Sequence, residues 1–127
     1  MPRTSITVQT APGYGEALDD ITYTAADASN NMDFQHPGGM VAVILKNKHS
    51  GSQVAQLVTV ANRRTFNEAG TKDLTAAAGS SADKECIAVL PAPGRGGEAF
   101  IQSDGKVHID IADDTALSIA VVALTQT

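Results

Sequence analysis

The chain has 127 residues, the size of one domain, and its fourteen Asp and Glu against nine Lys and Arg leave a net charge of −5. That charge disfavours direct binding to nucleic-acid phosphates, and 43 % hydrophobic residues with only 18 % charged ones exclude a disordered chain. Aromatic residues make up 4 % and Trp is absent, so the core must be built from Val, Ile, Leu and Ala. Such a light core favours association with other chains.

Targeting and membrane segments are not expected. The start of the chain is followed by no apolar stretch of the kind that a secretory signal needs, and the apolar runs at 40–45 and 118–124 are too short to cross a bilayer. A single cysteine, Cys86, cannot form a disulfide within the chain. These features predict a protein of a reducing cytoplasm, or of a particle assembled there.

The first half of the chain reads as an arm followed by short strands. Residues 1–20 are broken by Pro and Gly and alternate only at Ile6 and Val8, so we expect an extended N-terminal arm before a single β domain at 21–127. Short strands are predicted at 5–9, 21–24 and 32–35. The β-branched runs at 40–46 and 53–60 flank a polar turn with a glycine, which predicts a hairpin.

The second half continues the pattern. Residues 66–84 are expected to be a loop with one strand near Leu74, followed by a strand at 86–90. Residues 106–111 alternate strictly between polar and apolar, and Asp104 and Gly105 before them favour a type I′ turn from a strand at 98–102. A last strand is predicted at 117–124. Together these predict an all-β fold, a jelly-roll-like sandwich or small barrel.

No group of residues predicts an active site or a metal centre. His36, His49 and His108 are far apart in the sequence, so we interpret them as solvated side chains. Two acidic clusters lack the spacing of a calcium loop, and we expect them at hairpin ends and sheet edges: Asp19, Asp20 and Asp27, and Asp110, Asp113 and Asp114. Cys86 opens an apolar strand without a basic neighbour, as an inert buried thiol would. We therefore expect no catalytic residue, metal or cofactor.

The glycine-rich loop at 94–97 matches no phosphate-binding pattern. It is either an exposed loop or one that docks on a protein partner with Arg95 as its anchor.

The order of the predicted strands resembles a known family. The relevant segments are 23–27 leading into 32–34, then 41–47 with the strand that ends at 59–61, and finally 105–110 and 117–124. In this order they resemble the small auxiliary head proteins of tailed bacteriophages, the decoration or cement proteins that bind outside the capsid. The stretch at 67–84 and the loop at 91–97 depart from the family pattern.

This resemblance implies a non-enzymatic protein of the capsid exterior that is assembled in the host cytoplasm. It implies trimers at threefold or quasi-threefold positions, bound to the major capsid protein and stabilising an expanded shell, with no contact to nucleic acid or membrane. An N-terminal arm could add a strand to the sheet edge of a neighbouring subunit. The expected capsid or subunit contacts are then Thr4, Ile6 and Val8 in the arm, together with Arg95.

Two other classes remain open. A tail or head–tail joining protein of a phage would also be rich in β-structure and would form rings. A carbohydrate-binding jelly-roll module is the second alternative, although its usual aromatic platforms have few candidates here besides Tyr14 and Tyr23.

Overall fold

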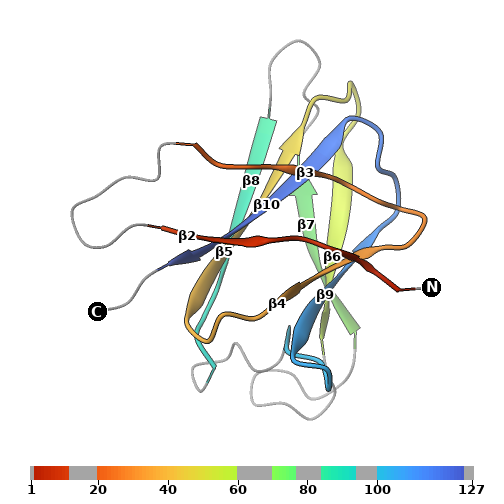
Figure 1. The fold of residues 1–127 in the computed structure, drawn as a ribbon. Helices are drawn as coiled ribbons and strands as arrows, with labels where there is room; N and C mark the ends of the chain where they lie inside the picture. The colour runs from red at the N-terminus through yellow and green to blue at the C-terminus, as the bar shows by residue number, and fades with distance from the viewer. Residues whose placement is uncertain (1, 12–19, 60–69, 77–83, 94–99, 125–127) are drawn as a thin grey trace.

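The chain forms a β-sandwich, seen in a computed structural model that describes residues 2–11, 20–59, 70–76, 84–93 and 100–124 (Figure 1). This described part contains no α-helix. Its strands are, in chain order, β1 (Thr4–Ser5), β2 (Val8–Thr10), β3 (Thr24–Ala25), β4 (Met32–Gln35), β5 (Met40–Asn47), β6 (Gln53–Thr59), β7 (Gly70–Ala76), β8 (Lys84–Leu90), β9 (Lys106–Ile111) and β10 (Leu117–Leu124).

The strands make two sheets. Sheet A has the order β1-β4-β9-β6-β7, and sheet B has the order β2-β10-β5-β8, with β3 also pairing with β10. Both sheets are mixed, because β1 runs parallel to β4 and β2 runs parallel to β10, while the other pairs are antiparallel. Two open sheets confirm the prediction of an all-β sandwich, in place of a closed barrel.

The core lies between the two sheets and is aliphatic, as the composition predicts. In β9 the residues alternate as expected: Val107, Ile109 and Ile111 are buried, while the residues between them face outward. The inward residues of β5 and β10 meet them from sheet B, and Phe34 and Phe100 are the aromatic members of the buried cluster. The strands predicted at 32–35 and 117–124 have the observed bounds.

The predicted hairpin between 40–46 and 53–60 is wrong, although both strands exist. β5 lies in sheet B between β10 and β8, whereas β6 lies in sheet A between β7 and β9. The turn between them crosses from one sheet to the other and is closed by side chains: Asn47 Oδ1 accepts from the N–H of His49, and Asn47 Nδ2 donates to the carbonyl of Gly51. Periodicity identifies each strand but does not reveal its partner.

The turn before β9 also differs from the prediction. Ile101 pairs with Val107, the N–H of Gly105 donates to the carbonyl of Gln102, and Gly105 has a positive φ while Asp104 does not. Three residues therefore form the turn, with a glycine in the left-handed region at its end, instead of the two-residue type I′ turn. Part of the strand predicted at 98–102 lies outside the described residues.

The segment at 66–84 was expected to be a loop with one strand, and the loop parts at 66–69 and 77–83 lie outside the described residues. The expected strand near Leu74 is confirmed as β7, which pairs with β6 over seven residues. β8 begins two residues before the predicted strand at 86–90, and β3 is shorter and later than the strand predicted at 21–24.

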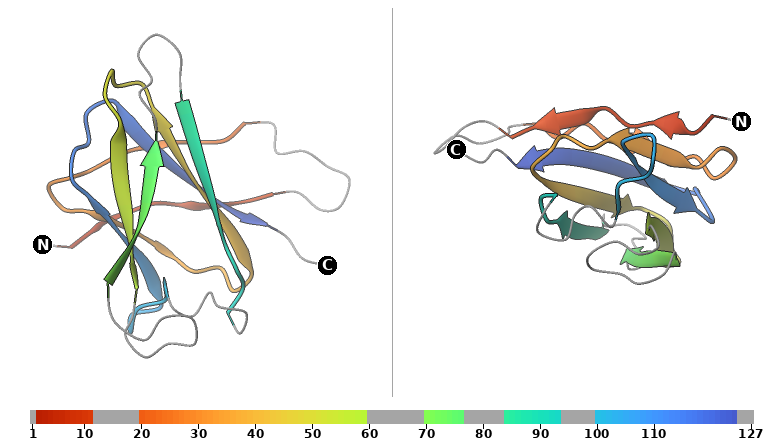
Figure 2. Two further views of the ribbon diagram at one scale, coloured as in Figure 1. Left: turned by 180° about the vertical axis from the view of Figure 1, so that it is seen from behind. Right: turned by 90° about the horizontal axis from the view of Figure 1, so that it is seen from below.

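The N-terminal segment is part of the sandwich and not a free arm. β1 extends sheet A beside β4, β2 extends sheet B beside β10, and Ile6 between them is only 4 % exposed. The segment thus crosses from one sheet to the other, on the side of the molecule opposite β7 and β8 (Figure 2). The alternation at Ile6 and Val8 predicted a strand, but the Pro and Gly residues beyond it suggested an arm that residues 2–11 do not form.

Candidate docking surface

The structure places the predicted contact residues in this chain's own fold. Thr4 is half-buried in β1, Ile6 is buried in the core, and Val8 packs against that core from β2. Ile6 therefore offers no side chain to a partner, because the gap that it fills lies inside the sandwich. Arg95 lies outside the described residues, so its predicted role stays a prediction.

Hydrogen bonds and an ion pair fix the start of the N-terminal segment. Nη1 of Arg3 donates to the carbonyls of Met32 and Ile109, at 3.2 and 3.3 Å, and lies 2.9 Å from Oδ1 of Asp110. The N–H of Ile6 donates to the carbonyl of Asp33 at 2.8 Å. One arginine thus attaches the segment to two strands of sheet A.

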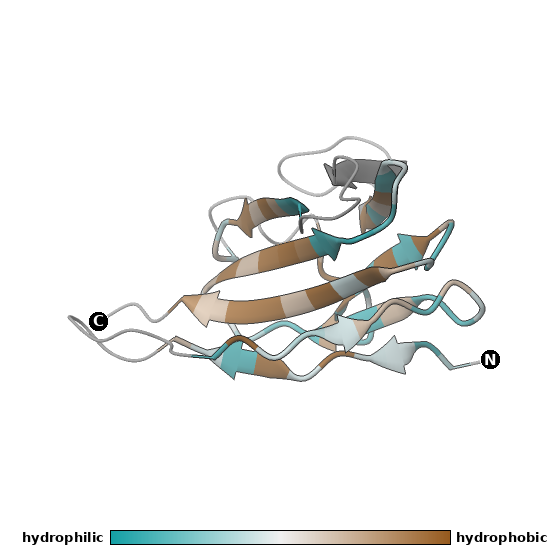
Figure 3. Ribbon diagram, turned by 90° about the horizontal axis from the view of Figure 1, so that it is seen from above, coloured by the Kyte–Doolittle hydropathy of each residue, from teal (hydrophilic) through white to brown (hydrophobic). Residues whose placement is uncertain are grey.

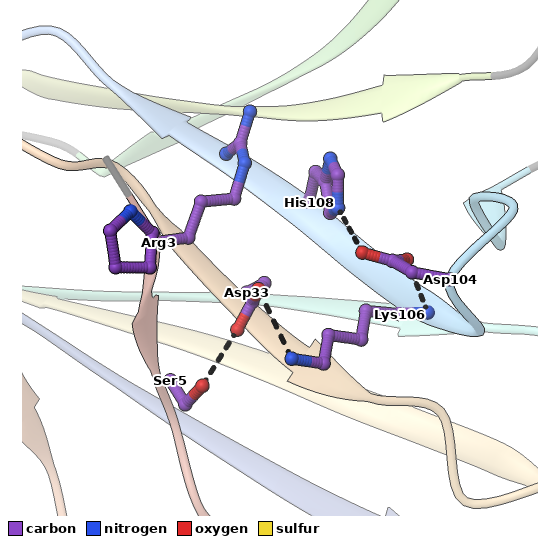
Figure 4. A pocket seen from close by; sticks show the side chains of 7 residues that line it. Arg3, Ser5, Asp33, Asp104, Lys106 and His108 are labelled. Carbon is purple, nitrogen blue, oxygen red and sulfur yellow. Dashed lines mark hydrogen bonds and ion pairs between the residues drawn. The ribbon is translucent and has the colours of Figure 1, made fainter.

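A polar pocket of about 390 Å³ lies next to this attachment, on the outer side of sheet A (Figure 4). Asp33 is its buried group: the hydroxyl of Ser5 donates to Oδ1 at 3.0 Å, and Nζ of Lys106 lies 3.8 Å from Oδ2. On the far wall, Nε2 of His108 lies 3.2 Å from Oδ2 of Asp104. Asp33 on β4 is thus joined to β1 by a hydrogen bond and to β9 by an ion pair.

The backbone N–H of Lys106, and after it His108, hold the pKa of Asp104 below its ordinary value. This carboxylate caps the turn that precedes β9, since its Oδ1 accepts the N–H of Lys106 at 3.0 Å. The Asp104 carboxylate thus organises this turn.

The second surface is apolar and covers the outer face of sheet B. Ile44 on β5 and Ala120 and Val122 on β10 form a buried cluster outside the main core. Three partly buried residues complete it, and we call the whole set the outer face: Ala11, Tyr23, Ile44, Ala120, Val122 and Leu124. Figure 3 shows hydrophobic residues running along the two central strands of this sheet. The three central residues are only 0–6 % exposed, so the chain itself covers the middle of this face, and the part left for a partner is its partly buried rim of Ala11, Tyr23 and Leu124.

The apolar surface continues onto the edge strand β8. Ile87 and Val89 are 62 % and 50 % exposed, the most exposed large hydrophobic side chains among the described residues. Ile87 pairs with Ile44 across the sheet, and Val89 pairs with Ala42, so both point to the same side as the outer face. We call these two residues the β8 strip.

A polar contact borders the outer face at one end of β8. The hydroxyl of Tyr23 donates to Oε2 of Glu85 at 3.0 Å, and Nζ of Lys46 lies 4.6 Å from the centre of the Tyr23 ring. Tyr23 thus interacts with both charged residues at the rim, with Glu85 through its hydroxyl and with Lys46 through its ring. Charged groups at the rim and apolar groups at the centre are the usual composition of a protein interface.

The histidines were expected to be solvated, but His36 and His49 make hydrogen bonds in turns, and His108 on β9 contacts Asp104. Nδ1 of His36 accepts the N–H of Gly38, and burial lowers the pKa of this ring. Nδ1 of His49 accepts the N–H of Gly51. Within the described ranges, no three His, Cys, Asp or Glu side chains lie close enough together to hold a metal ion.

Two acidic residues of the clusters cap turns, whereas Asp110 lies in β9, an inner strand of sheet A, and pairs with Arg3 in place of the expected sheet edge or hairpin end. Asp27 accepts the N–H groups of Ser29 and Asn30, and Asp113 accepts that of Thr115. Asp114 reaches across the fold to the N–H of Ala28 at 3.0 Å. Asp19 lies outside the described residues. Asp27 and Asp113 thus stabilise local turns, whereas Asp110 and Asp114 join segments that are distant in sequence.

The sequence reasoning missed the apolar outer face. The strands at 40–46, 86–90 and 117–124 read as continuous apolar runs, which are typical of strands buried on both sides. The runs themselves were the available signal, because a sandwich strand covered on one side needs polar residues at alternate positions.

Comparison with known proteins gives no relatives: no family model matches the chain, and neither a curated protein nor a solved structure is similar to it. No helix that could span a membrane is found in the part of the chain that the structure describes.

Proposed function

We propose that this chain is a non-enzymatic structural protein of a tailed bacteriophage, which binds the outside of the capsid as a multimer and stabilises the shell. The resemblance of its strand order to capsid decoration proteins motivates the proposal and implies a trimer bound to the major capsid protein. The observation that supports it on this chain is the apolar surface of sheet B, where the partly buried Leu124 of the outer face and the exposed β8 strip lie on the same side of the sheet. That side supplies apolar contact area on a rigid scaffold, as a cementing protein needs.

Multivalency makes the proposal energetically reasonable. A multimer presents several copies of the outer face to a shell with repeated binding sites. Once one copy binds, the others act at a high effective concentration, so a modest affinity per copy gives firm attachment. A small aliphatic face can then be sufficient without a large interface.

The test is co-sedimentation with expanded capsids that lack their auxiliary protein. We expect the wild-type chain to pellet with the shells and Leu124→Lys, at the end of the outer face on β10, to bind at least about tenfold more weakly, because the change costs at least ~1.4 kcal/mol per contact. Ser103→Lys is the matched control, since it adds the same charge in an exposed turn of the other sheet.

Two results would contradict the proposal. One is a wild-type chain that stays in the supernatant at every ionic strength. The other is equal binding by Leu124→Lys and wild type, which would remove the outer face from the contact. The mass in solution bears on the alternatives, because a hexamer or polymer favours a tail or head–tail joining role.

A further inference from the structure

The β8 edge of sheet B is not protected in the way that edge strands usually are. β8 pairs with β5 over seven residues, and no described strand pairs with its other side. Natural edges are commonly blocked by charges, proline or a bulge. The two charged residues of β8, Lys84 and Glu85, lie at its start, and the five residues from Cys86 to Leu90 carry no charge and no proline.

The same stretch carries the β8 strip. Ile87 and Val89 lie side by side on the outer side of the sheet, and both are β-branched residues that pair well across neighbouring strands. A strand added to this edge would cover both side chains and would satisfy the backbone groups of the edge. One added strand would therefore contact both the unpaired backbone of the β8 edge and the exposed side chains of the β8 strip.

The charge distribution favours a second copy of this chain as that occupant. The chain carries −5 overall, so two copies repel each other over most of their surfaces. Among the residues in the strands of sheet B, the single acid is Glu85, which is hydrogen-bonded to Tyr23 with Lys46 beside the ring. This side is thus one where two acidic copies can meet without facing rows of carboxylates.

We infer that two copies pair antiparallel through β8, with Ala88 on the twofold axis. In this register Ile87 lies opposite Val89 of the second copy, and Val89 lies opposite its Ile87. The two sheets B become one continuous sheet, and both outer faces point to the same side. A contact of this isologous kind is the commonest way for identical chains to associate.

Other registers pair the strip less well. With Ile87 on the axis, each Val89 would face a Glu85, and with Cys86 on the axis, each Ile87 would face a Glu85. Facing residues must lie on the same side of the continuous sheet, so registers differ by steps of two residues along the partner strand. The register centred on Ala88 is the one that places both exposed hydrophobic residues of each copy against exposed hydrophobic residues of the other.

This inference is independent of the capsid role and predicts a dimer, whereas the resemblance implies a trimer. The first experiment is light scattering after size-exclusion chromatography of the free protein. We expect a mass twice the 13.1 kDa of the chain, and a return to 13.1 kDa for Val89→Lys. Ile21→Lys is the control, because Ile21 is an exposed hydrophobic residue outside β8, and we expect it to remain dimeric.

The second experiment tests the register by disulfide trapping. In a Cys86→Ser background, one differently tagged chain carries Ile87→Cys and the other carries Val89→Cys. The Cβ atoms of directly opposed residues lie about 4.5–5.5 Å apart, within reach of a disulfide, whereas those of the diagonal pairs lie farther apart. We expect the mixture to give a cross-linked heterodimer in at least about tenfold excess over the homodimers that either variant forms alone.

Three outcomes would overturn the inference. A monomer or trimer that gives no heterodimer would exclude the β8 contact. Efficient homodimers of Ile87→Cys would contradict the register. Equal cross-linking by an Ile21→Cys control in the same background would show that the trapping is random. None of these measurements uses capsids, so they stand or fall separately from the proposed function.

Discussion

The edge strands on the two opposite sides of the sandwich differ in how firmly they are packed into the fold and how far their side chains are exposed. On one side, the N-terminal segment extends both sheets, inserts Ile6 into the core and attaches through Arg3 to two strands. On the other side, β8 has a strand on one flank and exposed Ile87 and Val89 on its outer surface. The chain itself completes the core on the first side, whereas no strand among the described residues pairs with the outer edge of β8.

Residues on the first side stabilise the fold, and exposed residues on the second side are available for binding. The N-terminal segment was predicted to reach a neighbouring subunit, but it pairs with strands of its own chain. The four predictions below test whether the first side carries stability and the second does not.

The largest effect is expected from deletion of residues 2–11. The truncation removes Ile6 from the core and uncovers β4 and β10 together, so we expect a loss comparable with the whole stability of a small domain, about 5–15 kcal/mol. Circular dichroism during urea unfolding would then show no cooperative transition. A truncated chain that unfolds at the same urea concentration as the full chain would show that the segment is an arm after all.

Ile6→Ala should have the next largest effect. Removal of a buried isoleucine side chain leaves a cavity and costs about 2–5 kcal/mol of the free energy of unfolding. The matched control is Ile87→Ala, the same change at a residue that is 62 % exposed, for which we expect a loss within about 0.5 kcal/mol. Similar losses at both sites in urea titrations would contradict the difference between the two sides.

Thr4→Val should have a smaller effect, visible on the acid side. The Thr4 hydroxyl, and after it the Asn30 groups, hold the pKa of Asp27 below its ordinary value. A lowered folded pKa means that this contact stabilises the fold above the unfolded pKa and that the contribution is lost as the pH falls through the folded pKa.

An NMR titration of the Asp27 carboxyl group measures this directly. We expect a pKa below 3.8 in the wild type and a rise toward that value in Thr4→Val. Thr10→Val makes the same change at an exposed position of β2 and should leave the titration unchanged. An unchanged pKa in Thr4→Val would mean that the hydroxyl does not hold the carboxylate.

The smallest effect on stability is expected from Ile87→Lys. Measured in dilute protein, where association contributes little, the free energy of unfolding should change by no more than about 0.5 kcal/mol. Its partner across the sheet, Ile44, is 6 % exposed, and Ile44→Lys should cost several times more. Equal losses at the two positions would show that the β8 strip is part of the folded core.

Some features of the site follow from local sequence and others do not. The turn-capping roles of Asp27, Asp104 and Asp113 follow from the preference of short carboxylates for nearby backbone N–H groups. The outer face does not, because a continuous apolar strand such as residues 40–46 does not reveal which distant part of the chain covers its second side, and here Ala11 and Tyr23 pack against it. The ionic contact of Asp33 with Lys106 joins residues that are distant in sequence, and no local pattern predicts it.

The sequence by itself determined where the chain extends and where it turns. The strict alternation of polar and apolar residues predicted β9, and a continuous apolar run predicted β10. Gly105 indicated a turn because glycine tolerates a positive φ. Only the tertiary structure decided which strands pair. In the structure β5 and β6 lie in different sheets, and the N-terminal segment forms an edge strand of each sheet. Pairing depends on which apolar surfaces remain uncovered once the whole chain has packed, and that is a property of no single segment.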